Sequence, residues 1–535
     1  MKLSSFFKSL FGKIDDDFLW RLKAWRLFLL LFVLLFPFIF SFLQNSTLSV
    51  LFVVSFLFLG IAFFSPRSVF ILMVTSVSFE IINFLPQEWS FSLRPYQFFV
   101  GIIFLGLLIR GTITLLKRKH LYFFPLNLID IGVLCIIFGG FVSAFFSEFF
   151  KESFRLNSIS VSFVLLYVLV RWFLRSNKDI ISIIPYVIAS FVSTVFYAIL
   201  QNILFLSHRD WHKEVMPGRP NAFFSEPDWL GFYLAILLFL LWFFFFSVEK
   251  KKRYKGDKIG ILLPLWIAST FGFMAFIITV SRSAWLGLFC GLSFLILWSV
   301  WKQKTQSIRK IFFLLLSFFI ALFYVLVFPL TNFELGNRAQ SSISGLQEIT
   351  ISCASKIELP SKISSDQELL AYNCQHIDLF EIEKESVSGK YVTRVFRKDP
   401  NAEIRKDIWQ KTQEIIRNNF FFGIGWGGTA SVFGEDSRGE HFNASNIFFG
   451  MWLGAGIGGF LGLLLIGVYV TFFSLQALFS KERETSKIGI GILGSFIVVA
   501  IFNMFNSSEF LAIMWIWLGI IGFLFSEMRN KKSNK

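Results

Sequence analysis

The sequence has 535 residues, of which 55% are hydrophobic and only 16% are charged, and its formal net charge is +16 at pH 7. Apolar runs of roughly 20 residues recur along it, which is the length that a helix needs to cross a bilayer about 30 Å thick. This composition excludes a soluble globular enzyme and predicts an all-α polytopic membrane protein. The basic residues stand in short clusters between apolar runs, so they indicate membrane topology and not a nucleic-acid-binding face.

Residues 1–26 form a basic N-terminus, and we find no signal-peptide cleavage pattern there. We therefore expect this segment to be retained on the cytoplasmic side of the membrane. Its basic side chains are Lys2, Lys8, Lys13, Arg21, Lys23 and Arg26.

About fourteen membrane spans follow from the length criterion, eleven of them within residues 27–330 and three within residues 447–527. A cytoplasmic tail is expected at residues 528–535. The spans are predicted near 27–44, 47–64, 68–85, 96–115, 128–147, 157–174, 180–203, 229–247, 259–279, 284–301, 311–330, 447–473, 488–506 and 509–527.

With the N-terminus inside, the strong basic clusters all fall on the cytoplasmic side of these spans. The same alternation places the polar segment 331–446 outside the membrane, together with the turns near residues 204–228 and 280–283. The clusters are Arg67, Lys117 to Lys119, Arg171 with Arg175 and Lys178, Lys250 to Arg253, Lys302 to Lys310, Lys481 with Arg483, and Arg529 to Lys532.

The external segment 331–446 contains two stretches of β-prone alternation, at residues 346–358 and 377–397. They predict a small strand-containing insertion, with an irregular loop as the alternative. Cys353 lies in the first stretch and Cys374 just before the second. We expect a disulfide between them if the segment faces an oxidising compartment.

After this insertion, residues 404–417 carry isoleucines at helical spacing and charged residues between them. This pattern predicts an amphipathic helix near the membrane surface. The glycine-rich run Gly423 to Gly428 follows it. No strand precedes these glycines, so they do not form a dinucleotide-binding fingerprint; they indicate a turn, either plain or with its backbone amides directed toward an anion.

Three arginines are predicted to lie outside the membrane: the first just before a span, the second in the turn between two spans and the third at the start of the surface helix. They are Arg219, Arg282 and Arg405. A charge held at the edge of the hydrocarbon suggests a use. A guanidinium offers a fixed fork of donors that suits phosphate. The alternative for each is contact with lipid headgroups or solvent.

Two further side chains are candidates for proton transfer or orientation. His441 lies outside, four residues before Ser445, and an imidazole can take a proton from a sugar hydroxyl near pH 7. A solvated loop histidine is the alternative. Glu226 stands before Pro227 at a span mouth and could orient a base or a cation, although acidic residues at helix starts also occur for dipole reasons alone.

Five motifs occur in a fixed order over about residues 200–470: Arg219 with the following Phe-Ser-Glu226-Pro and Leu230-Gly-Phe-Tyr-Leu; Thr279-Val-Ser-Arg282; Arg405-x-x-x-Trp409; Phe422-Gly-Ile-Gly-Trp-Gly427; and Asn446 with Gly456-Ile-Gly-Gly459. This ordered set resembles the O-antigen ligase and polymerase group of bacterial membrane glycosyltransferases. One departure stands out. The family commonly has His-Asn where this chain has Ser445-Asn446, so its histidine is displaced to His441 or absent, and sharing a face with Ser445 would require the helix to begin before Ala444.

The resemblance implies a metal-independent glycosyltransferase without a cofactor, which faces outward from the bacterial cytoplasmic membrane. Its donor would be a polyprenyl-pyrophosphate-linked glycan, and its acceptor a glycolipid, a glycan or a protein. Arg219 and Arg282 would stabilise the pyrophosphate leaving group and His441 would activate the acceptor. The expected substrate-binding residues are Arg405, Glu226, Trp409, Ser445 and Asn446.

Ligase and polymerase differ mainly in the acceptor, so both remain open. A transporter of lipid-linked glycan is the alternative from another class. It predicts charged residues within several spans or an internal inverted repeat. The first eight spans show few such charges, with Glu80 as the main exception, and no repeat is evident.

Overall fold

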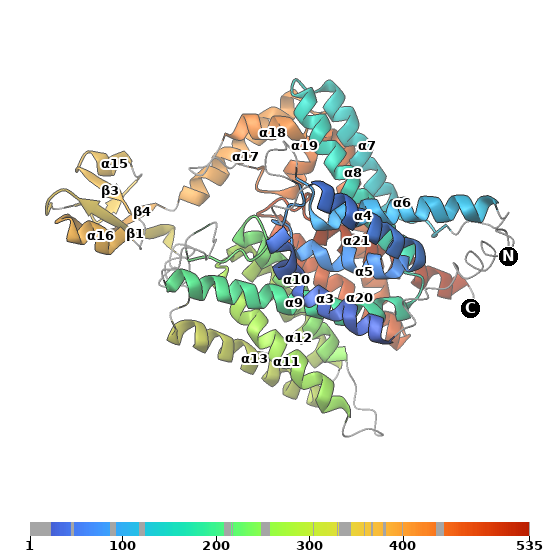
Figure 1. Ribbon diagram of the computed structural model, residues 1–535. Helices are drawn as coiled ribbons and strands as arrows, with labels where there is room; N and C mark the ends of the chain where they lie inside the picture. The colour runs from blue at the N-terminus through green and yellow to red at the C-terminus, as the bar shows by residue number, and fades with distance from the viewer. Residues whose placement is uncertain are drawn as a thin grey trace.

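Eleven helices precede residue 330 in the described part of a computed structural model of the chain, and most of them form one bundle (Figure 1). Their bounds are α3 (Lys23–Leu43), α4 (Leu48–Phe64), α5 (Pro66–Thr75), α6 (Pro95–Leu116), α7 (Leu128–Phe146), α8 (Phe150–Phe173), α9 (Asn177–Leu206), α10 (Pro227–Ser247), α11 (Asp257–Ile278), α12 (Arg282–Lys302) and α13 (Lys304–Val327). The structure describes residues 23–43, 48–85, 92–116, 123–207, 216, 218–247, 257–302, 304–328, 330, 344–357, 359–364, 367–377, 381–398, 400–434 and 443–533.

The last part of the chain returns to the bundle with three helices, α19 (Ile447–Leu478), α20 (Arg483–Asn503) and α21 (Ala512–Ser533). Within the described residues, ten helices are long and apolar enough to cross a membrane. A multi-pass membrane protein is therefore confirmed. Each of the fourteen predicted spans overlaps a helix, while their exact number remains a prediction.

The predicted span 68–85 is wrong in its second half. Helix α5 ends at Thr75, a single 3₁₀ turn, η1 (Ser76–Ser78), follows, and the chain then leaves helical structure. The reason lies in the side chains: the Thr75, Ser76 and Ser78 hydroxyls all donate to backbone carbonyls three or four residues earlier. Such local bonds compete with a continuing helix, and hydropathy does not register them.

Helices α7 and α19 pack closely because glycines line their interface. A Cβ added at Gly132 would lie 2.7 Å from the Gly462 carbonyl oxygen, and one at Gly139 would lie 2.6 Å from the Ala455 carbonyl oxygen. Small residues that let two backbones approach are typical of helix contacts within membranes. This contact fixes the position of α19, whose first turn carries Asn446 and the residues that follow it.

Helix α19 is kinked near its start, where Gly456 has a φ of +62°. The kink exposes backbone groups that the preceding loop then uses. The Ile457 N–H donates to the Phe421 carbonyl (3.0 Å), and the Ile424 N–H donates to the Leu453 carbonyl (2.9 Å). The glycines after the surface helix are thereby held against the membrane bundle.

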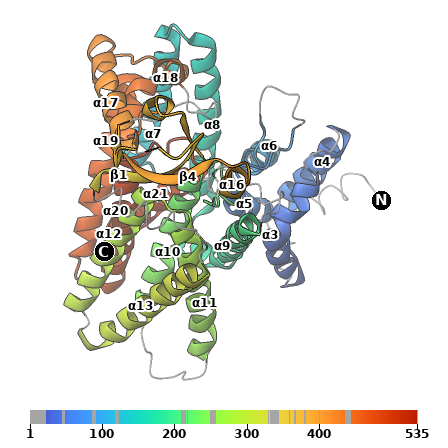
Figure 2. The ribbon, with the colours of Figure 1, turned by 90° about the vertical axis from the view of Figure 1, so that its left-hand side faces the viewer.

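A small sheet stands apart from the helices between residues 344 and 398, on the left of Figure 1 and in front of the bundle in Figure 2. Its strand order is β2-β4-β1-β3, and β1 pairs antiparallel with both β3 and β4. The strands are β1 (Leu346–Cys353), β2 (Lys362–Ile363), β3 (Cys374–His376) and β4 (Tyr391–Lys398), accompanied by the short helices α15 (Gln367–Leu370) and α16 (Ile382–Val387). The strand-containing insertion is confirmed, and we call it the β module.

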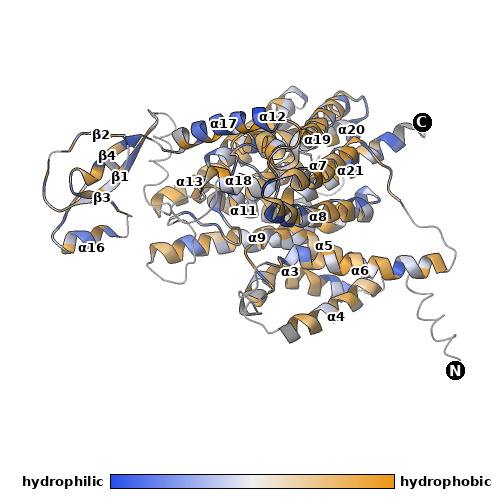
Figure 3. Cartoon of the chain, turned by 90° about the horizontal axis from the view of Figure 1, so that it is seen from above, coloured by the Kyte–Doolittle hydropathy of each residue, from blue (hydrophilic) through white to orange (hydrophobic). Residues whose placement is uncertain are grey.

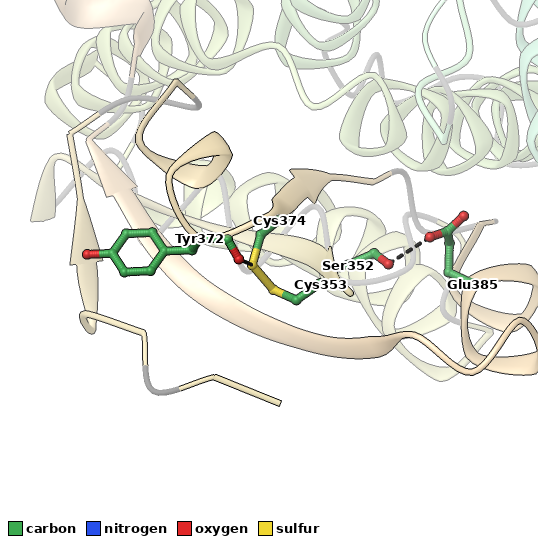
Figure 4. Close-up of a disulfide and its surroundings, with 5 residues drawn as sticks. All are labelled: Ser352, Cys353, Tyr372, Cys374 and Glu385. Carbon is green, nitrogen blue, oxygen red and sulfur yellow. Dashed lines mark hydrogen bonds between the residues drawn. A yellow bond between two sulfur atoms is a disulfide. The ribbon is translucent and has the colours of Figure 1, made fainter. Parts of the chain in front are cut away.

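The β module has its own small core and a disulfide. Ile349 and Ile351 are buried on one face of β1, as predicted, and Val395 lies opposite Ile349 on β4. Cys353 and Cys374 lie opposite each other and are bonded, which confirms the disulfide (Figure 4). The predicted strand stretch 377–397 is wrong in its first half, which contains α16, because its glutamates and lysine favour a helix.

A helix is confirmed where the sequence predicts one, as α17 (Pro400–Asn418), and its place near the membrane surface stays a prediction. Ile408 and Ile416 are buried against α18 (Trp426–Phe433) and the start of α19, whereas Ile404 is exposed. The helix is largely blue in Figure 3, in contrast to the orange helices of the bundle. It therefore lies across one end of the bundle with its apolar side inward.

Candidate functional site

Segments that the sequence places on the external side contact one another at one end of the bundle. We call this end the site end and define it by residues 216–228, 279–283, 420–428, 443–446 and 504–511. Helices α10, α12 and α19 begin there, and α11 and α20 end there. Most of the sequence-predicted site residues that the structure describes are thus brought to one region.

Arg219 is buried and contacts protein groups on three sides. Its Nε donates to the Thr279 carbonyl (3.0 Å), one terminal nitrogen contacts the Met216 sulfur (3.1 Å), and the other lies 3.3 Å from Asp228 Oδ2. The Ser281 hydroxyl donates to the other oxygen of Asp228 (2.5 Å). Arg219 therefore ties the loop before α10 to the turn before α12.

Arg282 is the first residue of α12 and is half-buried. The turn that presents it is tight, since Val280 has a φ of +52°, which is rare for a β-branched residue. The neighbouring Ser283 hydroxyl accepts a hydrogen bond from Asn506 Nδ2 (2.7 Å). The turn is thus held by Arg219 on one side and by the loop after α20 on the other.

Arg405, Trp409 and Asn446 lie where α17 crosses the start of α19. The Arg405 guanidinium is 5.9 Å from the ring centroid of Phe505, and the Trp409 ring is 6.4 Å from that of Phe449. Asn446 caps α19, since its Oδ1 accepts the backbone N–H of Phe448 (2.9 Å). These contacts bring the second half of the motif set to the site end.

The residues before α19 do not form a helix. Ser445 has a φ of +49°, its N–H donates to Asn443 Oδ1 (2.8 Å), and α19 begins only at Ile447. The condition for His441 and Ser445 to share a helix face, a helical turn that begins before Ala444, is therefore not met, because the Asn446 cap starts the helix later. His441, the predicted base, lies outside the described residues.

Glu226 directly precedes α10 and is half-buried, and its backbone carbonyl accepts the N–H of Leu230 (3.3 Å). The glycine run Gly423 to Gly428 forms a plain turn, as the partners of three of its backbone amides indicate. The N–H groups of Ile424 and Gly425 both donate to the Leu453 carbonyl, and the Gly427 N–H donates to Ser153 Oγ (3.1 Å). These amides face protein acceptors and not an anion.

The loop between α20 and α21 is the part of the site that sequence reasoning missed. The predicted spans 488–506 and 509–527 left only two residues between them, but α20 ends at Asn503 and α21 begins at Ala512. The loop contacts Ser283 through Asn506 and Asn446 through the Met504 carbonyl (3.1 Å). The available signal was a polar run, Asn503-Met-Phe-Asn-Ser-Ser-Glu509, between two apolar stretches.

Residues 267–464 match the family described as O-Antigen ligase. This part of the chain is therefore similar to the O-antigen ligase family. The match covers Arg282, Arg405, Trp409 and Asn446, begins after Arg219 and ends before the α20–α21 loop. No curated protein matches the sequence.

Proposed function

We propose that this O-antigen ligase family protein transfers a glycan from a polyprenyl-pyrophosphate carrier to an acceptor at the outer face of the bacterial cytoplasmic membrane. The observation that carries the proposal is the shared position of the Arg282 turn, Arg405 and Asn446 at one end of an apolar bundle. A carrier lipid keeps its pyrophosphate at headgroup depth, so a cationic side chain at the end of a span meets it there.

Arg282 is proposed to stabilise the pyrophosphate as it leaves, because charge develops on the bridging oxygen in the transition state. Arg219 is proposed to support it by holding the 279–282 turn through the Thr279 carbonyl and Asp228. Arg405, Trp409, Glu226, Ser445 and Asn446 would border the substrate. By family resemblance, His441 is the candidate for the acceptor proton.

The charged groups of the bundle give the transporter alternative little support. Glu80, the main mid-span exception in the sequence, lies outside α5 and η1 and forms an ion pair with Arg94. A transport route would need charged side chains along the spans, whereas this pair stands at the outer end of α6.

Two measurements test the proposed function. In a deletion strain, accumulated lipid-linked oligosaccharide with an unmodified acceptor would support a ligase, and single-repeat products would support a polymerase. With the purified protein, Arg282→Ala should reduce transfer by about 10²–10³-fold, affecting donor binding and turnover together because the pyrophosphate is charged in both states. Arg417→Ala, at an exposed arginine of α17, is the matched control. Transfer by Arg282→Ala at the wild-type rate would contradict the proposed role.

A further inference from the structure

Two buried polar side chains face the same small cavity at the site end. Glu509, in the α20–α21 loop, is 7% exposed, and Asn157, on α8, is 1% exposed. Within the described residues, Glu509 Oε2 and both polar atoms of the Asn157 side chain have no hydrogen-bond partner. An unpaired buried polar group costs about 1–3 kcal/mol, and more when it is charged. Two such groups at one cavity therefore call for an explanation.

The cavity between them has room for about one water molecule. About 10 Å³ is open to the centre of a water-sized sphere, close to the minimum that one water occupies. The carboxyl group and the amide would supply polar partners for it. The other lining residues come from α7, α8, α18, α19, α21 and the α20–α21 loop, and all of them are uncharged.

The carboxyl group also lies against the first turn of α19. A Cβ added at Gly450 would be 3.1 Å from Glu509 Oε1 and 2.9 Å from Ser507 Oγ, so the absence of a side chain there admits both groups. Gly450 is four residues after Asn446 and shares its face of the helix, at a rise of about 5–6 Å. Asn446 itself contacts the same loop through the Met504 carbonyl.

We propose that Glu509 is a catalytic residue of the glycosyl transfer, and that its carboxylate takes the proton of the acceptor hydroxyl directly or through one water. This inference rests on the proposed function. The acceptor oxygen forms a bond to the anomeric carbon, and the bond from that carbon to the pyrophosphate oxygen breaks. Its electron pair leaves with the pyrophosphate, and the hydroxyl proton passes to Glu509 and then to solvent. The carboxyl group thereby takes the role for which His441 is the candidate by family resemblance.

The surroundings of Glu509 suit a proton acceptor at neutral pH. Burial raises the pKa of Glu509 to about 7, and the adjacent Ser507 hydroxyl counteracts part of that rise. A base works best when its pKa lies near the working pH, since it is then both partly ionised and sufficiently basic. A carboxyl group with the usual pKa of a glutamate would be a weaker base.

The test uses the purified full-length protein with a lipid-linked glycan donor and its acceptor. Glu509→Gln keeps the shape of the side chain and removes the base, so kcat should fall by about 10²–10⁴-fold. The wild-type kcat should rise with pH through about 7, and the variant should lack this rise. Glu509→Asp should retain part of the activity. Glu484→Gln, at a 76% exposed glutamate on the opposite side of the bundle, is the matched control.

A second measurement does not depend on activity. A hydrophobic carbodiimide modifies protonated carboxyl groups, so labelling of Glu509 should fall as the pH rises through about 7, and the acceptor should slow it. Labelling that is independent of pH over this range would overturn the inference. A Glu509→Gln variant as active as the wild type would also overturn it, because Glu509 would then have only a structural role. Loss of the pH-dependent rise in kcat in His441→Ala, with the rise kept in Glu509→Gln, would overturn it as well. Absence of transfer by the wild type with every donor and acceptor would instead overturn the proposed function, and the role of Glu509 with it.

Discussion

Two buried charged groups at opposite ends of the helical bundle differ in how completely they are paired. At the end away from the site, Arg171 is 1% exposed and its guanidinium contacts Asp130 (3.1 Å), the Pro125 carbonyl (2.6 Å) and Ser526 (3.2 Å). Tyr167 also donates to Asp130. At the site end, the Glu509 carboxyl group has an oxygen without a partner among the described residues.

This difference separates structural from functional charge. A buried ion pair with further hydrogen bonds compensates the loss of water around both charges, and removing one partner leaves the other uncompensated. The Arg171 cluster meets that condition and joins α7, α8 and α21. Within the described residues, Glu509 has an oxygen without any partner and forms no such cluster, so its burial points to a use that changes during a reaction cycle.

The largest effect is expected at the Arg171 cluster. Arg171→Met leaves Asp130 buried without its cation, so the variant should lose about 3–5 kcal/mol of unfolding free energy. Denaturant unfolding of the purified protein in detergent measures this loss. Lys487→Met serves as the control: Lys487 forms a pair with the exposed Glu484 at the same end, and such a pair near the surface contributes about 0–1 kcal/mol. Equal stabilities of Arg171→Met and the wild type would show that the cluster is not structural.

Long apolar helices and their approximate limits were predictable from the sequence, because hydropathy and length decide where a helix crosses a membrane. The positions where helices end early were not predictable in this way. At Thr75 to Ser78 and at Asn503 to Glu509, hydroxyl and amide side chains end helices by local hydrogen bonds, which a hydropathy average hides. The motif residues were predicted by type, but Asp228, Ser281 and Asn506 join them through contacts between distant segments. Those contacts depend on how α10, α12 and α20 pack.

An intermediate effect concerns the β module, which is attached to the site end. Cys353→Ser should remove the disulfide to Cys374 and destabilise the module by about 2–4 kcal/mol. The bundle should keep its stability, because the module has a separate core. Limited proteolysis within the module measures the effect, and Cys290→Ser, at a cysteine of α12, is the control.

Thiol labelling in intact cells tests the same disulfide. If the site end faces outward, a membrane-impermeant thiol reagent should label Cys353 and Cys374 only after reduction. Equal labelling with and without reductant would contradict the disulfide.

The last expected effect is a dependence of stability on pH at Glu509. Its pKa is raised from about 4.5 to about 7 in the folded protein, so the folded state holds this proton more tightly than the unfolded state. The resulting contribution to stability is fully present below about pH 4.5 and is lost as the pH rises through about 7. The Gln side chain of Glu509→Gln cannot ionise, so this variant should not lose that contribution. The Tm of the variant minus the Tm of the wild type should therefore increase from pH 5 to pH 8. Thermal unfolding in detergent over this range provides the measurement, with Glu484→Gln as the exposed control. A Tm difference that stays constant with pH would mean that Glu509 does not titrate there. Because this experiment needs no substrate, it tests the titration of the buried Glu509 carboxyl group independently of catalysis.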